Sequence, residues 1–554
     1  MNQESQQAIV HALLDNGILT SPDLLNADDI EKESLLKLIK EHNLAGQSFL
    51  VLTKDIYSAL KNNNIGEASK ANLDVDWLEF DGSRVLFEKK QNIKPYNAFL
   101  DAMHPNLMVK NNLAIETNIP ELKVLSTKDI KLSSGVVVTK NYNEPSKKRG
   151  IKDYVSYYKH RYNFATHLLR GRAELQNILS INRLKGRQIS EQVSLIGLVY
   201  DKIITRQGNA IITLEDATGH FKVFVSKEGP LKDILPYVTY DEVIGVSGHI
   251  KNNLLFAKTL LFPDIPFDHK GKTTDEEVYA TFISDVHIGS KMFLEKDFLK
   301  FIDWLNGNEG TDVQRTLAKK IKYLFVVGDV IDGVGVYPNQ ESELLIKDVY
   351  DQYAKTKELL SLIREDIQII MCPGNHDAVR IAEPQPNVNE FSEVLLGMKN
   401  LTLVSNPAIV NIHANQNNPG VDVLMYHGYS YDYYAASVEP IRTGGAYDRV
   451  DLIMKYLLQK RHLAPAHTST LYLPCASEDP LLIEKIPDIF VSGHVHKSNV
   501  ANYNGVLLIG SSCWQAKTSF QEKLGHNPDP GKVSIVNLKT REVTFMNFCE
   551  GEKK

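Results

Sequence analysis

The sequence predicts a multidomain α+β protein, with a small helical N-terminal domain, a small closed β-barrel and a large C-terminal domain whose strands end in polar residues. Three observations predict this order. Apolar residues recur every three or four positions in residues 1–72, alternate with polar residues in 186–268, and form short continuous runs in 276–554. At 554 residues the chain is too long for one hydrophobic core.

The composition is that of an ordinary globular protein, with 43% hydrophobic and 23% charged residues. No stretch is apolar for long enough to span a bilayer, and the N-terminus lacks the regions of a signal peptide, so we expect a cytoplasmic protein without membrane contact. Four scattered cysteines without a CxxC pair predict neither a zinc knuckle nor a disulfide framework. The net charge of −6 argues against a coat of positive charge for nonspecific DNA binding, but it allows a local basic patch or an acidic metal site.

Residues 1–72 read as short amphipathic helices, such as "IEKESLLKLIKEHN", and we interpret them as a docking module. Residues 73–185 form an irregular connecting region that includes the strand-like run "SGVVVTK" and ends in a basic, aromatic helix. The apolar stripe of this helix is predicted to contain Val155, Tyr158, Tyr162, Ala165 and Leu169. Two interpretations remain open: the helix contacts nucleic acid through its lysines, arginines and tyrosines, or it packs on a neighbour and leaves its charges in water.

Residues 186–268 contain five short strand-like runs with glycine-containing turns at 207–209 and 218–219. This pattern predicts a small closed barrel of the OB type. Such barrels often bind single strands, but aromatic residues at the strand centres are few, Phe221 and Phe224 among them. A barrel that binds a partner or serves a structural purpose is an equal alternative. A polar linker then leads to the last domain, residues 276–554.

Five strand-like runs in that domain each end in residues that commonly bind metal ions. In chain order these residues are Asp285 and His287; Asp329 and Asp332; Asn375, His376 and Asp377; His427; and His494 and His496. One such group alone is more typical of a polar turn. Five groups in succession, each beside a glycine, predict a metal-binding site.

The residue types indicate which chemistry this site performs. Two divalent ions about 4 Å apart need a bridging carboxylate together with terminal imidazoles and carboxylates. Mixed His, Asp and Asn ligation suits Mn²⁺ best here, with Fe²⁺, Zn²⁺ and Mg²⁺ as alternatives, and it disfavours Ca²⁺. The spacing of Asp285 and His287 lets both side chains face the same way, because alternate residues of an extended segment share a face, and the same holds for His494 and His496.

The motifs D-x-H, G-D-x-x-D, G-N-H-D, a lone H-G and G-H-x-H, in this order, resemble the calcineurin-like metallophosphoesterase superfamily over about residues 276–550. The resemblance implies a four-layer αββα domain. It implies two metal ions, one held by Asp285, His287, Asp329 and His496, and the other by Asp329, Asn375, His427 and His494. It further implies that His376 protonates the leaving oxygen or stabilises the transition state, oriented by Asp377. For Asp332 we expect a structural hydrogen bond rather than ligation.

A barrel followed by such a domain resembles, more narrowly, the small subunits of archaeal family-D DNA polymerases and the related B-subunits of eukaryotic replicative polymerases. The stretches that carry this resemblance include "DYVSYYKHRYNFATHLLRGRAEL", "LLQKRHLAP" and "EKIPDIFVSGHVH". The eukaryotic B-subunits are marked by loss of the ligands that this chain retains. The resemblance therefore implies a 3′→5′ exonuclease on single strands and primer 3′ ends, which proofreads for a separate large catalytic subunit. A sliding clamp stays open as a further partner.

Two other functions compete with the nuclease. One is a non-catalytic assembly subunit of the polymerase, against which the retained ligands argue. The other is a phosphodiesterase that acts on another substrate, for which the barrel and helices have no role. Nearby, Arg461, His462 and His467 either steer DNA toward the metals or pack the insertion that contains them. The tyrosines of "YHGYSYDYY" either stack on frayed bases or pack beside the site.

Overall fold

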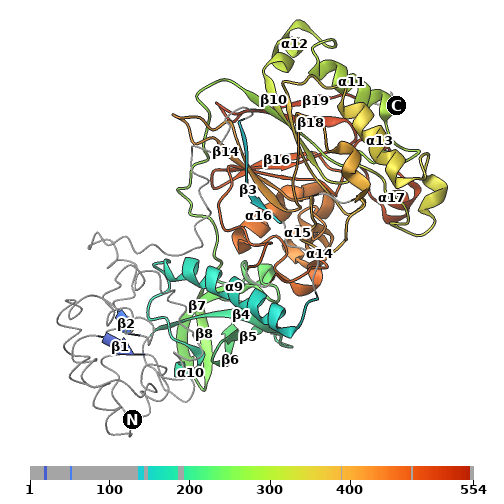
Figure 1. Cartoon of the computed structure of the whole chain (residues 1–554). Helices are drawn as coiled ribbons and strands as arrows, with labels where there is room; N and C mark the ends of the chain where they lie inside the picture. Colours follow the sequence, from blue (N-terminus) through green and yellow to red (C-terminus); the bar gives the residue numbers. More distant parts are fainter. Residues whose placement is uncertain are drawn as a thin grey trace, which may run out of the picture. The chain divides into compact units, whose positions relative to one another are not determined.

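The computed structural model describes residues 135–142, 148–184, 192–387, 390–475 and 478–549, together with two short strands nearer the N-terminus (Figure 1). The chain divides into two compact units, residues 1–126 and 127–554. In the first unit, β1 (Ile18–Thr20) and β2 (Leu50–Leu52) pair in parallel. The helices predicted for residues 1–72 lie outside the described residues.

The second unit contains the predicted barrel. Its strands are β4 (Val193–Ile204), β5 (Ala210–Asp216), β6 (Gly219–Val225), β7 (Val243–Lys251) and β8 (Leu254–Leu261). They close in the order β4-β5-β6-β8-β7, and only the β6–β8 pair is parallel. Alternate residues point inward, as Ala210, Ile212 and Leu214 do from β5. The alternating pattern therefore predicted this domain correctly.

The basic helix of the connecting region is α9 (Ile151–Arg170), and it packs against β4 and β7 of the barrel. Its buried residues are Tyr157, Arg161, Ala165 and Leu169. The predicted stripe was partly wrong, because Val155 is 48% exposed and the arginine at 161 takes a buried position. The helix turns a different face inward because the Arg161 guanidinium finds buried partners in the last domain. These contacts favour packing over the nucleic-acid interpretation of α9.

The last domain is built on two six-stranded sheets (Figure 1). The first has the order β12-β11-β10-β9-β18-β19, from β9 (Tyr279–Ile283), β10 (Ile321–Val327), β11 (Gln368–Cys372), β12 (Leu401–Leu403), β18 (Lys532–Asn537) and β19 (Val543–Asn547). The second has the order β16-β17-β15-β14-β13-β3, from β3 (Val136–Asn141), β13 (Ala408–Ile412), β14 (Val421–Met425), β15 (Ile489–Ser492), β16 (Asn499–Tyr503) and β17 (Val506–Gly510). The strand-like run "SGVVVTK" thus forms β3, an edge strand of the second sheet.

The two sheets face each other across an apolar core to which Phe325, Ile370 and Val423 contribute. A second apolar cluster joins the first sheet to α11 (Glu295–Leu305), α12 (Asp312–Lys319) and α13 (Val349–Leu360). A third joins the second sheet to α14 (Tyr431–Ser437), α15 (Glu439–Thr443) and α16 (Val450–Lys460). The layers therefore follow one another as helix, sheet, sheet, helix (Figure 1).

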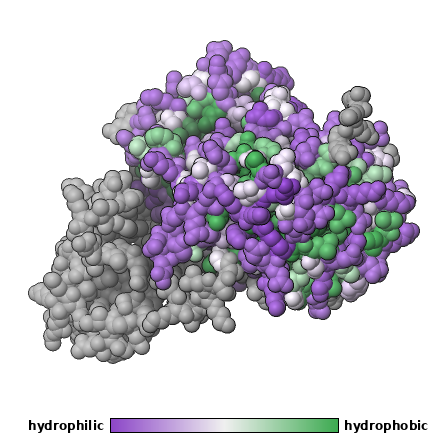
Figure 2. All heavy atoms as spheres, turned by 90° about the horizontal axis from the view of Figure 1, so that it is seen from above, coloured by the Kyte–Doolittle hydropathy of each residue, from purple (hydrophilic) through white to green (hydrophobic). Residues whose placement is uncertain are grey.

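Two further α-helices among the described residues of the second unit are short, α10 (Ile181–Leu184) and α17 (Ser519–Leu524). On the face drawn in Figure 2, hydrophobic residues form several separate patches among hydrophilic ones. Among the described residues, no helix combines the length and the apolar character that crossing a membrane requires.

Candidate metal centre

The predicted ligands stand directly after the carboxyl ends of five strands. Three of these strands, β9, β10 and β11, are parallel neighbours in the first sheet, and β14 and β15 are parallel neighbours in the second. Residues after neighbouring parallel strands meet at one edge of a sheet. Because the two sheets are stacked, the two edges supply opposite sides of a single site.

The first ligand group comes from the segments after β9 and β15. One ligand atom from each of Asp285, His287 and His496 lies within 4.8 Å of the others, and all three residues are buried. The Nε2 atoms of His287 and His496 are 3.1 Å apart, and Nε2 of His496 is 3.3 Å from Oδ1 of Asp285. Two imidazole nitrogens that face each other beside a carboxylate are a donor set suited to a divalent cation.

The second ligand group comes from both sheets. Asp329, His427 and His494 offer atoms within 4.8 Å of one another, and Oδ1 of Asn375 lies 3.1 Å from His427 Nε2 and 3.0 Å from His494 Nδ1. Oδ2 of Asp329 is 3.2 Å from His427 Nε2 and 3.9 Å from Nε2 of His287 in the first group. The structure thus brings all seven predicted ligands together and places Asp329 between the two groups.

Two glycines allow this close approach. A Cβ atom at Gly374 would meet the Asp329 carboxylate and come within 2.8 Å of His427 Nε2. A Cβ atom at Gly328 would collide with the His427 ring, and this residue also has φ +81°, which favours glycine. The glycines noted beside the motifs therefore have a geometric purpose here.

His376 and Asp377 follow Asn375 in the same loop. Nδ1 of His376 lies 2.9 Å from the Asp332 carbonyl oxygen, and its ring is edge-on to His287 at 4.7 Å. The carboxylate of Asp377 accepts hydrogen bonds from the backbone N–H groups of Gly374 (2.8 Å), Val330 and Ile331 (both 3.3 Å). The carbonyl of Asp332, rather than Asp377 as expected, orients the His376 ring, and Asp377 joins the loops after β10 and β11.

In this cluster the buried carboxyl groups and the imidazoles shift each other's pKa values. Burial opposes ionisation of Asp329, but His427 and its other neighbours hold the pKa of this carboxyl well below its usual range. Burial also lowers the pKa of His427, but the Asp329 carboxylate outweighs it and raises that pKa to about 10. Burial, with Asp329 nearby, raises the pKa of Asp377 to about 7. Buried carboxylates beside imidazoles need a positive charge for stability, and a divalent cation would supply it, so the donor set fits a metal.

Comparison with known proteins agrees with this architecture. Residues 280–500 match the model of the DNA polymerase alpha/epsilon B-subunit family. A protein of Methanothermobacter thermautotrophicus, named DNA polymerase II small subunit, is 41% identical over 70% of this chain and 78% of its own length. The chain belongs to the family of DNA polymerase II small subunits. A relative of the same name from Pyrococcus horikoshii is 34% identical over 94% of this chain and 82% of its own length.

Side chains behind the ligands of this small subunit fix the imidazoles. Oδ1 of Asp332 lies 3.0 Å from Nδ1 of His287, which is the structural hydrogen bond expected of Asp332. Nε2 of Gln515 donates to the same oxygen at 3.1 Å, and Gln521 lies 3.0 Å from Nδ1 of His496. Asp432 is 3.2 Å from Nε2 of His494. The glutamines were missed from the sequence because they stand far from the motifs and have no diagnostic spacing.

The basic and aromatic residues near the motifs are mostly packed. Arg461 and His462 are each 2% exposed, and Arg461 donates to the carbonyls of Ile483 and Glu484 at 2.8 and 2.7 Å. The packing interpretation therefore holds for both, whereas His467 is exposed and lies 2.8 Å from the Tyr472 hydroxyl. The tyrosines with no exposed surface, which pack rather than stack on bases, are Tyr426, Tyr431 and Tyr434. Tyr429 remains half-buried beside His494, with ring centres 5.7 Å apart.

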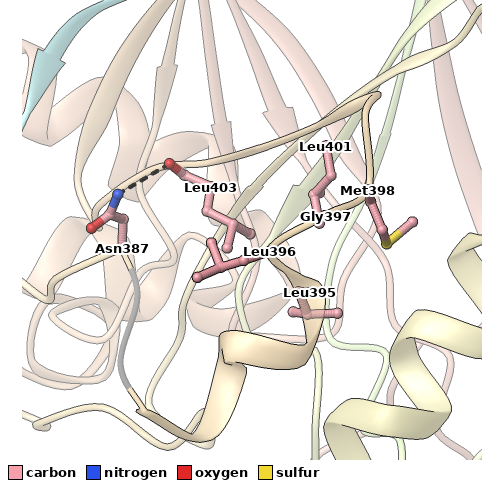
Figure 3. A pocket seen from close by; sticks show the side chains of 7 residues that line it. All are labelled: Asn387, Leu395, Leu396, Gly397, Met398, Leu401 and Leu403. Carbon is pink, nitrogen blue, oxygen red and sulfur yellow. Dashed lines mark hydrogen bonds between the residues drawn. The ribbon is translucent and has the colours of Figure 1, made fainter.

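None of the residues that line the pocket shown in Figure 3 is a predicted ligand. Its apolar lining comes from Leu395, Leu396, Met398, Leu401 and Leu403, near β12. Asn387 closes one end with a hydrogen bond to the Leu403 carbonyl at 3.3 Å. The apolar lining offers no side chain that commonly binds a metal ion, so we do not assign this pocket to the metal centre.

Proposed function

We propose that this small subunit is a 3′→5′ exonuclease that proofreads for a large catalytic subunit, on single strands and on primer 3′ ends. Its last domain would then be a metallophosphoesterase of the calcineurin-like type. The observation that carries the proposal is the convergence of the seven predicted ligands in two groups, with Asp329 between them. This donor set fits two divalent ions, of which Mn²⁺ is the first candidate and Fe²⁺, Zn²⁺ and Mg²⁺ are alternatives.

In phosphodiester hydrolysis, the predicted ligands would each bind one or both of the metal ions. Asp285, His287 and His496 would hold one ion, while Asn375, His427 and His494 would hold the other, with Asp329 as the shared ligand. When bound, such ions neutralise phosphate charge and make water a stronger nucleophile.

His376 stands at the edge of the ligand cluster with its Nδ1 donating to the Asp332 carbonyl. Its Nε2 then faces away from that bond, and in the protonated ring this nitrogen would give a proton to the leaving 3′ oxygen. The fixed orientation of the ring supports this assignment, because a proton donor must be held within hydrogen-bond reach of the leaving group.

A 5′-labelled single-stranded oligonucleotide with Mn²⁺ tests the proposal. The wild type should produce a ladder that shortens from the 3′ end. His376→Ala should lower the rate by a factor on the order of 10² or more, as loss of a general acid does, and Asp329→Asn should abolish cleavage. His249→Ala, at an exposed barrel position, is the matched control and should cleave normally.

The same assay is repeated with the large subunit present, and with a mispaired primer terminus. Wild-type protein that fails to cleave any of these substrates, alone or with its partner, would contradict the nuclease proposal. That result would favour a non-catalytic assembly subunit, or a phosphodiesterase that acts on another substrate.

A further inference from the structure

Two buried amide side chains, Gln385 and Asn406, lie behind the second ligand group. They are 2% and 0% exposed, and neither belongs to a metal-binding motif. Their backbones form a short antiparallel bridge, with Gln385 N donating to Asn406 O at 2.7 Å and Asn406 N donating to Gln385 O at 3.0 Å. The bridge joins the segment after the GNHD loop to the segment that enters β13.

The two amides form a chain of hydrogen bonds between ligand loops. Nε2 of Gln385 donates to the carbonyl of Gly374 at 3.1 Å, one residue before the ligand Asn375. Nδ2 of Asn406 donates to Oε1 of Gln385 at 2.7 Å. The backbone N–H of the ligand His427 then donates to Oδ1 of Asn406 at 2.9 Å. A continuous path of three hydrogen bonds therefore runs from the Asn375 loop to His427.

The chemistry of this path needs side-chain amides. Each of the two residues must donate on one side and accept on the other, and among side chains of this length only the amides do so without a charge. In a buried site each bond is strong, and an unpaired group costs about 1–3 kcal/mol. The path thus couples the positions of two ligands that come from different sheets.

The first ligand group does not use this path. His287 is held by Asp332 and His496 by Gln521, at 3.0 Å in both cases. A change at Gln385 or Asn406 should therefore affect the second ligand group, while the hydrogen bonds that hold the first ligand group stay in place.

We infer that Gln385 and Asn406 form a positioning pair that sets the affinity of the half-site made by Asn375, His427 and His494 for its metal ion. This inference rests on the proposed two-ion function. The two side chains bond to backbone groups of the ligand loops, the Gly374 carbonyl and the His427 N–H, so the pair acts through the position of the backbone.

The test measures Mn²⁺ binding to the full-length protein by titration calorimetry and electron paramagnetic resonance. Gln385→Glu has the same shape but loses the two N–H donors, and Asn406→Asp loses the donor to Gln385 but keeps the acceptor for His427. Asn400→Asp is the matched control, because Asn400 donates to the Ile367 carbonyl at 3.0 Å at the opposite end of β11. The melting temperature of the metal-free proteins reports general destabilisation.

The expected result is selective. One Mn²⁺ ion keeps its wild-type affinity in both variants, while the second binds about 10- to 100-fold more weakly, which is the usual effect of losing a group that orients a ligand. The resonance spectrum changes from that of two coupled ions to that of an isolated one at equal loading. Asn400→Asp retains both ions.

Three results would overturn the inference: equal weakening of both ions, no weakening of either, or a wild type that binds one ion. Should Gln385→Glu fail to fold, Asn406→Asp decides by the same readout. Normal binding of two ions without DNA cleavage counts against the proposed nuclease alone, so the two failures are distinguishable.

Discussion

At the scale of single residues, the backbone of the centre is strained. Asp285, His287, Asp329, His494 and His496 all have positive φ, between 48° and 71°. Non-glycine residues in this region cost about 1–2 kcal/mol each. A structural turn would place glycine or asparagine at such positions. Five strained ligands in one cluster therefore indicate selection for the direction of the side chains.

Gly374→Ala tests how closely the loops must approach. The added methyl group would meet the Asp329 carboxylate and the His427 ring, so we expect Mn²⁺ affinity to fall by a factor of about ten or more. Titration calorimetry measures this loss. Gly171→Ala, where the nearest atom is an ordinary 3.5 Å away, serves as the control. Normal affinity in Gly374→Ala would mean that the loop shifts freely and that its geometry is not critical.

The sequence indicated the clustered residues of the centre better than the residues that support them. Asp285, Asn375 and the other clustered residues could be found because each follows an apolar strand in a short motif. Gln385 and Asn406 could not be found, since they lie 21 positions apart in irregular segments and meet only through the fold. The role of Asp377 was misjudged for the same reason, because adjacency in sequence does not give the direction of a side chain.

At the scale of elements, α9 is fixed to the insertion before β15 by a buried polar cluster. Nε of Arg161 donates to Oδ2 of Asp479 at 3.0 Å, and Nε2 of His462 lies 2.8 Å from the same oxygen. Burial and the nearby Arg161 lower the pKa of His462 to about 4. The imidazole is therefore neutral at neutral pH in the folded protein.

This cluster predicts a loss of stability in mild acid. Because the pKa of His462 falls from 6.5 to about 4 on folding, the unfolded chain binds more protons between these values. The free energy of unfolding should thus drop as the pH falls, with His462 contributing about 2 kcal/mol between about pH 7 and about pH 5. Burial opposes ionisation of Asp479, but the His462 imidazole and the Arg161 guanidinium hold the pKa of this carboxyl below its usual range. The contribution of Asp479 to stability is therefore lost only in stronger acid.

Denaturant unfolding of the wild type and of His462→Gln at the two pH values measures the effect. The variant has no imidazole to titrate, and its stability should depend less on pH by about 2 kcal/mol. An identical pH dependence in both proteins would contradict the buried neutral state of His462.

How far elements could be predicted depended on the range of their interactions. The barrel strands were found because alternation is a local signal, and the strands before the ligands because they are continuous apolar runs. The buried face of α9 differs from the predicted one because Arg161, a charged residue, is buried through its hydrogen bond to Asp479. The membership of β3 in the second sheet could not be predicted, since its partner β13 lies about 270 residues away.

At the scale of the whole molecule, a buried ion pair joins the barrel to the last domain. Nζ of Lys460 in α16 lies 2.5 Å from Oε2 of Glu242 beside β7, and both side chains are at most 2% exposed. Lys460 also donates to the Tyr237 carbonyl at 2.8 Å, and the hydroxyls of Tyr456 and Thr239 are 2.8 Å apart. Burial lowers the pKa of Lys460 to about 8 and raises the pKa of Glu242. Each side chain therefore needs the opposite charge of the other to stay ionised in the interior.

A double-mutant cycle on this pair tests whether the barrel and the last domain unfold together. Lys460→Met alone leaves Glu242 buried without its partner and should lower the free energy of unfolding by about 3–5 kcal/mol. Adding Glu242→Leu should return this free energy toward the wild-type value, because apolar replacements of a buried ion pair are often neutral. Denaturant unfolding gives the free energies, and hydrogen exchange in β7 reports the barrel separately. If the losses of unfolding free energy in the two single variants simply add in the double variant, the two residues are not coupled. If Lys460→Met leaves hydrogen exchange in β7 unchanged, the barrel is stable without the interface.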